Sequence, residues 1–339
     1  MTSDASPIFA CSLATTPSLA RKSVALVVLT LQNTALLLLT KFSFFRETSP
    51  YLPSTVIVCA ELLKLVASFL LTVYSGSFGS LSRAIHDLCH SATRLALPSV
   101  LYYVQNSLLF EGVRLLSPMV YIVCSQTKIL TSAAFSVLLL DVHLGWQQYA
   151  SFVLLMCGMI LVQQSEAALP DSERRTSDSS SQGLFITLTA TVISGFTGAY
   201  IEKLYKGAGN GRQHSIWLRN TQLACFSLPV AFLGAFWRDG DTIRELGFFQ
   251  GYDDVVLMII CLQALGGLVV AAVMRYASNI LKCFAVSVSI CMCTIATFLV
   301  DIDGTRDVRK VGVLIPGLIL VIVSTFLYSS KRIRCKLAS

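Results

Sequence analysis

The chain alternates between long apolar stretches and short polar gaps along almost its whole length. Ten stretches stand out, at residues 23–42, 55–74, 97–116, 119–140, 146–164, 183–204, 215–237, 254–276, 280–300 and 311–329. Each is long enough, as a helix, to cross a hydrocarbon core of about 30 Å. Helices satisfy their own backbone hydrogen bonds where water is absent. The pattern therefore predicts an all-α polytopic membrane protein with ten transmembrane helices.

A polar, serine-rich segment at residues 165–182 divides the stretches into two sets of five. Because five is odd, two related halves would insert with opposite orientations, as two inverted five-helix repeats. We expect the first half at 23–164 and the second at 183–330. Lys128 and Lys282 give weak support, since each lies near the start of its stretch and precedes an apolar run.

Basic clusters at the two ends of the chain indicate its orientation. Arg21 and Lys22 precede the first stretch, and Lys and Arg recur through residues 331–336. Cytoplasmic segments next to membrane spans carry an excess of Lys and Arg. We therefore expect cytoplasmic tails at 1–22 and 331–339, which requires an even number of spans, and a luminal linker at 165–182.

Three lysines lie inside apolar stretches, namely Lys64, Lys128 and Lys282. Each charge at the centre of a membrane helix costs roughly 2.5–3.5 kcal/mol, so three cost on the order of 8–10 kcal/mol. That total is tolerable if the lysines face one polar cavity, and a cationic cavity suits an anion. For Lys64 an alternative stays open, because Glu61 lies three residues earlier and could neutralise it.

Tyrosines and amides share the expected helix faces with these lysines. They are Tyr102 and Asn106 in the third stretch, Tyr121 in the fourth, Asn220 in the seventh and Asn279 in the ninth. Tyr121 and Lys128, seven residues apart, fall on one stripe of a helix. Tyrosines and amides can stack on and hydrogen-bond a nucleobase, while lysines pair with phosphate.

Composition narrows the functional classes. Of 339 residues, 54% are hydrophobic and 13% charged, about half the charged fraction of a soluble protein. The formal charge of +7 forms no basic stripe that would follow nucleic acid. The eleven cysteines lie mostly in apolar stretches without metal-site spacing, so we expect no metal and no cofactor. Asp301-Ile302-Asp303 is similar to a sugar-transfer motif, but the loops are too short for an enzyme domain.

Seven segments form a recognisable combination, at residues 102–106, 121–131, 194–203, 216–222, 247–252, 262–268 and 279–282. In this order they resemble nucleotide-sugar transporters, in the branch of the Golgi UDP-galactose, UDP-N-acetylglucosamine and CMP-sialic acid carriers of the drug/metabolite transporter superfamily. The resemblance covers roughly residues 20–330. The chain departs from the pattern at Ser125, Arg275 and Ser278.

The resemblance implies ten helices in inverted halves. It also implies a Golgi or ER antiporter that imports a nucleotide sugar in exchange for a nucleoside monophosphate. On this basis the base and ribose would contact Tyr102, Asn106 and Tyr121, the phosphate Lys128 and Lys282, and the sugar Glu61 and Lys64, with Asn220 and Asn279 nearby.

The segment 265–273 is more similar to the UDP-sugar carriers, which favours UDP-N-acetylglucosamine, UDP-N-acetylgalactosamine or UDP-galactose exchanged for UMP. The alternatives are a CMP-sialic acid/CMP antiporter, a drug or metabolite exporter of the same fold, and a polytopic glycosyltransferase. The expected partners are the nucleotide sugar, the monophosphate and the lipid bilayer, with no nucleic acid. The sequence also leaves a homodimer open.

Overall fold

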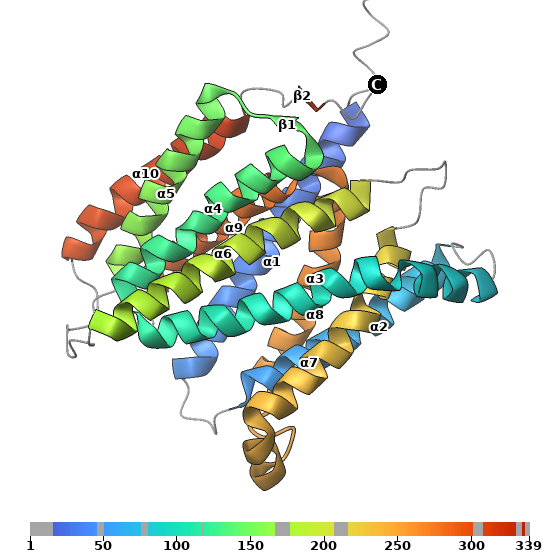
Figure 1. The fold of residues 1–339 in the computed structure, drawn as a ribbon. Coiled ribbons are helices and arrows are strands. Elements are labelled where there is room, and N and C mark those ends of the chain that lie inside the picture. Colours follow the sequence, from blue (N-terminus) through green and yellow to red (C-terminus); the bar gives the residue numbers. More distant parts are fainter. Residues whose placement is uncertain are drawn as a thin grey trace, which may run out of the picture.

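The protein is an inclined bundle of helices (Figure 1), seen in a computed structural model that describes residues 16–45, 51–75, 81–116, 118–166, 177–206, 216–300, 308–329 and 334–335. The all-α class predicted from the sequence is confirmed for these residues. The helices are α1 Thr16–Phe45, α2 Pro53–Tyr74, α3 Leu81–Leu115, α4 Pro118–Leu140, α5 Trp146–Glu166, α6 Ser177–Lys206, α7 Ile216–Leu246, α8 Asp254–Tyr276, α9 Asn279–Val300 and α10 Val308–Ser329.

A two-residue ribbon marks one end of the bundle. β1, Val142–His143, pairs antiparallel with β2, Arg334–Cys335. We call this the ribbon end, and the opposite one the distal end (Figure 1). The short connection from α8 to α9 lies at the ribbon end, and the connection from α3 to α4 at the distal end.

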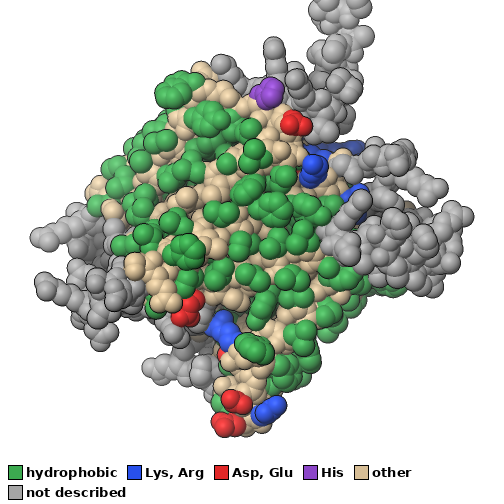
Figure 2. All heavy atoms as spheres, viewed as in Figure 1, with side chains coloured by type: hydrophobic (Ala, Val, Ile, Leu, Met, Phe, Trp, Pro, Cys, Tyr) green, Lys and Arg blue, Asp and Glu red, His purple; other side chains and the backbone are tan. Residues whose placement is uncertain are grey.

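Six helical segments within the described residues are long and apolar enough to cross a membrane. They are Arg21–Ser43, Pro53–Tyr74, Val123–Leu140, Ser181–Lys206, Asp254–Tyr276 and Asn279–Leu299. Large apolar side chains such as Phe185 and Phe326 lie exposed on the outside of the bundle. Figure 2 shows hydrophobic side chains across the middle of one face and most charged groups towards its edges. This distribution suits a protein surrounded by lipid.

Local sequence determines where several helices begin and end. Pro53 stands in the first turn of α2, where its missing N–H needs no partner. Asp253 caps α8, since its side chain accepts a hydrogen bond from the Val256 N–H at 2.9 Å. α7 bends at Asp239 and ends before Gly247, whose φ of +91° suits glycine.

Several helices extend beyond the predicted apolar stretches. α3 begins at Leu81, inside a segment that the sequence analysis left between two stretches, and α6 begins at Ser177, inside the predicted linker. Hydropathy detects only the part of a helix that lipid surrounds, whereas the helix continues as long as backbone geometry allows. The position match between Lys128 and Lys282 is also corrected, because Lys128 lies in the middle of α4 and Lys282 in the first turn of α9.

The helices pack in a pattern that recurs between the first five and the last five. α4 packs on α6 and α9 on α1; α3 packs on α6 and α8 on α1; α3 packs on α7 and α8 on α2. α2 packs on α7, and α5 packs extensively on α10. Exchanging each helix with the one five places later therefore reproduces these main contacts.

The α5–α10 contact depends on two facing glycines. A Cβ at Gly317 would lie 2.9 Å from Val162 Cγ2 and 3.0 Å from the Gly158 oxygen. Phe152, Phe284 and Tyr328 continue this core, with 4.7 Å between the ring centroids of Phe284 and Tyr328. The glycines let the two backbones approach closely, as is usual between membrane helices.

We predict that Gly317→Leu lowers the free energy of unfolding by about 1–3 kcal/mol, because the new side chain overpacks the α5–α10 contact. SDS-induced unfolding in mixed micelles measures this. The control is Gly312→Leu on the same helix, where a Cβ meets nothing within 4 Å and the expected change stays within about 0.5 kcal/mol. Equal effects of the two substitutions would contradict the packing argument.

Candidate functional site

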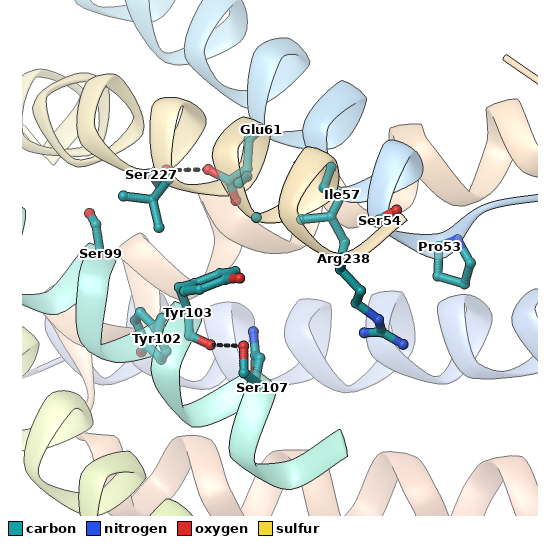
Figure 3. Close-up of a pocket in the computed structure, with 15 residues that line it drawn as sticks. Pro53, Ser54, Ile57, Glu61, Ser99, Tyr102, Tyr103, Ser107, Ser227 and Arg238 are labelled. Carbon is teal, nitrogen blue, oxygen red and sulfur yellow. Dashed lines mark hydrogen bonds between the residues drawn. The ribbon is translucent and has the colours of Figure 1, made fainter. Parts of the chain in front are cut away.

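A polar cleft lies between α2, α3 and α7 towards the distal end (Figure 3). Its volume is about 180 Å³. α2 enters it with its first turns, α3 with its middle, and α7 with its second half. The polar lining consists of Ser54, Glu61, Ser99, Tyr102, Tyr103, Asn106, Ser107, Ser227 and Arg238.

Glu61 is the acidic group of this cleft, and it holds two partners. Lys64 Nζ lies 2.5 Å from Glu61 Oε2 and donates to Oε1 at 2.7 Å. The Ser227 hydroxyl of α7 also donates to Glu61 Oε2 (Figure 3). The buried aliphatic stem of Lys64 lies against Gly267 of α8. This ion pair therefore connects α2 to both α7 and α8, and the alternative in which Glu61 neutralises Lys64 holds in the structure.

Tyr102 and Asn106 lie one turn apart on α3 and both line the cleft. Tyr102 also packs against a buried cluster that contains Tyr205 of α6 and Met274 of α8. The Tyr205 hydroxyl donates to Asn220 Oδ1 at 3.5 Å. Asn220 is 2% exposed and its Nδ2 has no hydrogen-bond partner among the described residues. Tyr102 thus links the cleft to the buried amide of α7.

Lys128 of α4 and Lys282 of α9 form a second cationic group. The two helices pack together, and the Cys283 thiol lies 3.8 Å from the Ser132 hydroxyl. Both lysines are half-buried, and their charges are close enough to interact. Among the described residues, no carboxylate lies within 4 Å of either ammonium group. The structure therefore leaves two neighbouring cations uncompensated.

The two remaining predicted residues lie near opposite ends of the bundle, Tyr121 at the start of α4 and Asn279 at the start of α9. Tyr121 of α4 is half-buried, and its ring lies near Gly112 of α3. Asn279, at the start of α9, is 1% exposed and packs against Gly198 of α6. Neither its side-chain nitrogen nor its side-chain oxygen has a partner among the described residues. A buried amide with all its hydrogen-bonding capacity unused is costly and indicates a missing partner.

The structure places the predicted residues in more than one group. Glu61, Tyr102 and Asn106 line the cleft and Lys64 is bound to Glu61, whereas Lys128 and Lys282 lie on α4 and α9, which pack together. That all three lysines face one cavity stays a prediction. Lys64 differs from the other two lysines because it has a carboxylate one turn away. The physical reason is local: an i, i+3 pair on one helix forms whatever the neighbouring helices do.

Sequence reasoning missed six polar residues of the cleft, and two of them, Ser227 and Arg238, lie on α7. Helical spacing contained a signal for Ser227. Asn220, Ser227 and Gly234 lie seven residues apart and share one face of α7. Arg238, about one turn further, points towards the cleft in Figure 3. No group of three or more His, Cys, Asp or Glu among the described residues is placed to hold a metal ion.

Membrane-length helices around a polar cleft and a pair of uncompensated cations define a polytopic membrane protein that handles a polar, anionic solute. Comparison with known families agrees with this class. The family model for the nucleotide-sugar transporter matches residues 17–329. The chain belongs to the nucleotide-sugar transporter family, whose members are transporters and not enzymes.

Characterised relatives cover most of the chain. The human UDP-N-acetylglucosamine transporter is 41% identical over 316 residues, which span 91% of this chain and 94% of that protein. The UDP-N-acetylglucosamine/UDP-N-acetylgalactosamine transporter nstp-4 of Caenorhabditis elegans is 37% identical, covering 91% and 93%. The mouse UDP-galactose translocator is 36% identical, covering 81% and 71%. One solved crystal structure, at 10% identity, covers 91% and 97% with a TM-score of 0.64, which shows a shared fold alone.

We predict that Glu61→Ala lowers the free energy of unfolding by about 3 kcal/mol, because it leaves the buried Lys64 without its counter-charge. The double variant Glu61→Ala/Lys64→Leu should recover most of that loss, since it removes the stranded charge as well. SDS titration of each variant completes the cycle.

An exposed pair of the same spacing serves as control. Asp241 and Arg244 lie 4.0 Å apart with side chains 98% and 81% exposed, so Asp241→Ala should cost no more than about 1 kcal/mol. A double variant as unstable as Glu61→Ala would show that the ion pair is not what Glu61 contributes.

Proposed function

We propose that this protein imports a UDP-sugar into the Golgi lumen in exchange for UMP, the sugar being N-acetylglucosamine, N-acetylgalactosamine or galactose. The observation that carries the proposal is the pair Lys128 and Lys282, two cations on packed helices with no carboxylate near them. A diphosphate or monophosphate supplies the missing negative charge. The substrate class is supported by relatives that are 36–41% identical and named for UDP-sugars.

Different residues bind different parts of the nucleotide sugar. Lys128 and Lys282 hold the phosphates. Tyr102, Asn106 and Tyr121 hold the base and ribose, with Asn220 and Asn279 supplying amides nearby. The unpaired amide atoms of Asn220 and Asn279 support this assignment, because a bound nucleotide can satisfy them.

Glu61, paired with the buried Lys64, lines the sugar side of the cleft. Their mutual pairing leaves a neutral, strongly polar surface, which suits the hydroxyl and N-acetyl groups of an uncharged hexose better than a second anion.

The size of the cleft argues for movement during transport. About 180 Å³ is below the roughly 300–1,000 Å³ usual for ligand pockets, so a nucleotide sugar needs the helices to separate further. Alternating access achieves this by rocking two structural repeats around a fixed site.

The repeats we propose are residues 23–164 and 183–330, each a five-helix half inverted relative to the other, in a protein with ten spans. The recurring contacts support this, since α4 packs on α6 as α9 packs on α1. The ribbon end carries Lys22, Lys206 and Arg275, so we assign it to the cytosol and the segment 165–182 to the lumen. Both tails, 1–22 and 331–339, then lie in the cytosol.

Exchange follows from the same two lysines. When the carrier is empty, closing the site removes water from Lys128 and Lys282 and leaves them unpaired, which costs several kcal/mol. Bound phosphate offsets that cost on the inward step with the UDP-sugar and on the return step with UMP. The loaded carrier therefore reorients faster than the empty one.

We predict that Lys128→Ala abolishes uptake of labelled UDP-sugars into proteoliposomes preloaded with UMP, while the protein still inserts and remains folded. The substitution removes a phosphate partner and slightly favours insertion. Lys203→Ala, at an exposed lysine of α6, is the matched control and should transport normally. Near wild-type uptake by Lys128→Ala would place the phosphate site elsewhere. Uptake of CMP-sialic acid in place of UDP-sugars by the wild type would change the substrate class.

We also predict that preloaded labelled UMP leaves slowly into plain buffer and rapidly when external UDP-sugar is added. Lys282→Gln should narrow this difference, because the empty site then closes at lower cost even though affinity falls. Equal efflux with and without external UDP-sugar would indicate a uniporter and contradict the argument from the lysines.

A further inference from the structure

The recurring packing pattern makes the α3–α4 connection equivalent to the α8–α9 connection. The two connections nevertheless make different contacts with the other helices. At the ribbon end, α8 and α9 contact α6, and α8 contacts α7. The equivalent contacts at the distal end would join α3 and α4 to α1, and α3 to α2. Among the described residues these pairs make no comparable contact, and the cleft lies between α2 and α3 at that end. Among the described residues the bundle is therefore closed at the ribbon end, whereas the cleft lies towards the distal end.

A buried carboxylate holds the closed end together. Glu202, near the end of α6, is 2% exposed. Its Oε2 accepts a hydrogen bond of 2.7 Å from the backbone N–H of Asn279, the first residue of α9. Its Oε1 lies 2.5 Å from the ammonium group of Lys206. One carboxylate thus ties the end of α6 to the start of α9, where a negative charge also interacts favourably with the helix dipole.

The surroundings of Glu202 span both halves of the chain. A second cavity, of about 200 Å³, is lined by Glu202 and Lys206 together with Lys22 of α1 and Ser136 of α4. The turn between α8 and α9 forms another of its walls, through Ala277 and Ser278. If the α8–α9 turn moved away from α6, this cavity would open to the ribbon end.

Asn279 belongs to this contact and to the proposed binding site at the same time. Its backbone N–H is bound to Glu202, while its buried side chain has no hydrogen-bond partner in the described part of the chain. Lys282 lies one turn further along α9. A ligand that binds the Asn279 side chain and Lys282 therefore contacts the first turn of α9. The Glu202 carboxylate binds the backbone N–H of the same turn.

We propose that Glu202 is the latch of the cytosolic gate, holding α9 against α6 while the cleft is open to the lumen and releasing it when the site opens to the cytosol. This inference rests on the proposed function for its direction across the membrane. The latch itself is a contact between α6 and α9 and can be tested without transport. Glu202 acts through Asn279 and α9, so it is a positioning residue.

The first experiment compares hydrogen exchange of the empty wild type and Glu202→Ala in lipid nanodiscs. Loss of the latch should speed exchange at the ribbon end, in peptides covering 138–145 and 276–283. It should slow exchange at the cleft, in peptides covering 53–61 and 227–238, because the two ends open alternately. Glu202→Gln retains an acceptor for the Asn279 N–H and should change exchange less. Glu245→Gln, at an exposed glutamate of α7, is the control.

Faster exchange throughout the bundle in Glu202→Ala and Glu202→Gln would show a general loss of stability and overturn the proposal. A hydrogen-exchange pattern of Glu202→Ala equal to that of the control Glu245→Gln would overturn the proposal as well. Opposite changes at the two ends support the latch, because a purely structural role cannot protect one end while exposing the other.

The second experiment measures apparent affinity from each side in proteoliposomes of known orientation. Glu202→Ala should shift the carrier towards the cytosol-open state. It should then bind cytosolic UDP-sugar about five- to tenfold more tightly than the wild type, and luminal UMP more weakly by a similar factor. Weaker binding on both sides would overturn the latch. Absence of UDP-sugar transport by the wild type would contradict the proposed function alone, since the exchange pattern still decides the latch.

Discussion

Charged side chains inside this bundle must be compensated, because neither hydrocarbon nor close-packed protein solvates an ion well. The structure meets this requirement locally at two places. Glu61 is paired with Lys64 and accepts a hydrogen bond from Ser227, and Glu202 is paired with Lys206 and accepts one from the Asn279 N–H. Lys128 and Lys282, by contrast, have no carboxylate within 4 Å of their ammonium groups among the described residues. This is the place at which we propose that a phosphate binds.

α5 and α10 form a tightly packed helix pair beside the helices that carry most of the polar groups. α5 and α10 meet through Gly158 and Gly317 and share an aromatic core around Tyr328. They contribute no residue to the cleft or to the lysine pair. The chemically important residues lie instead on α2, α3, α4, α7 and α9, whose contacts differ between the two ends. A stable helix pair beside an asymmetric set of helices suits a carrier that alternates between two openings.

Much of this could be read from the sequence. Each of the ten helices in the described residues contains all or nearly all of one of the predicted apolar stretches, because lipid-length hydrophobic runs leave the backbone few alternatives. Tyr102 and Asn106 were predicted to share one face, since helical spacing alone places them one turn apart. Ser227 was within reach of the same argument through its heptad spacing from Asn220. Glu202 was not, because its role depends on a backbone N–H of a helix far away in the sequence.

The sequence by itself determined which segments are helical, which of them lipid can surround, and that cations lie inside them. These properties follow from composition and from the fixed 3.6-residue period of a helix. Only the tertiary structure decided that Ser227 joins the Glu61–Lys64 pair, that Lys128 and Lys282 lie on helices that pack together, and that Glu202 binds the Asn279 N–H. Such facts depend on which helices meet and at what level, and backbone geometry within one helix carries no information about a partner more than a hundred residues away.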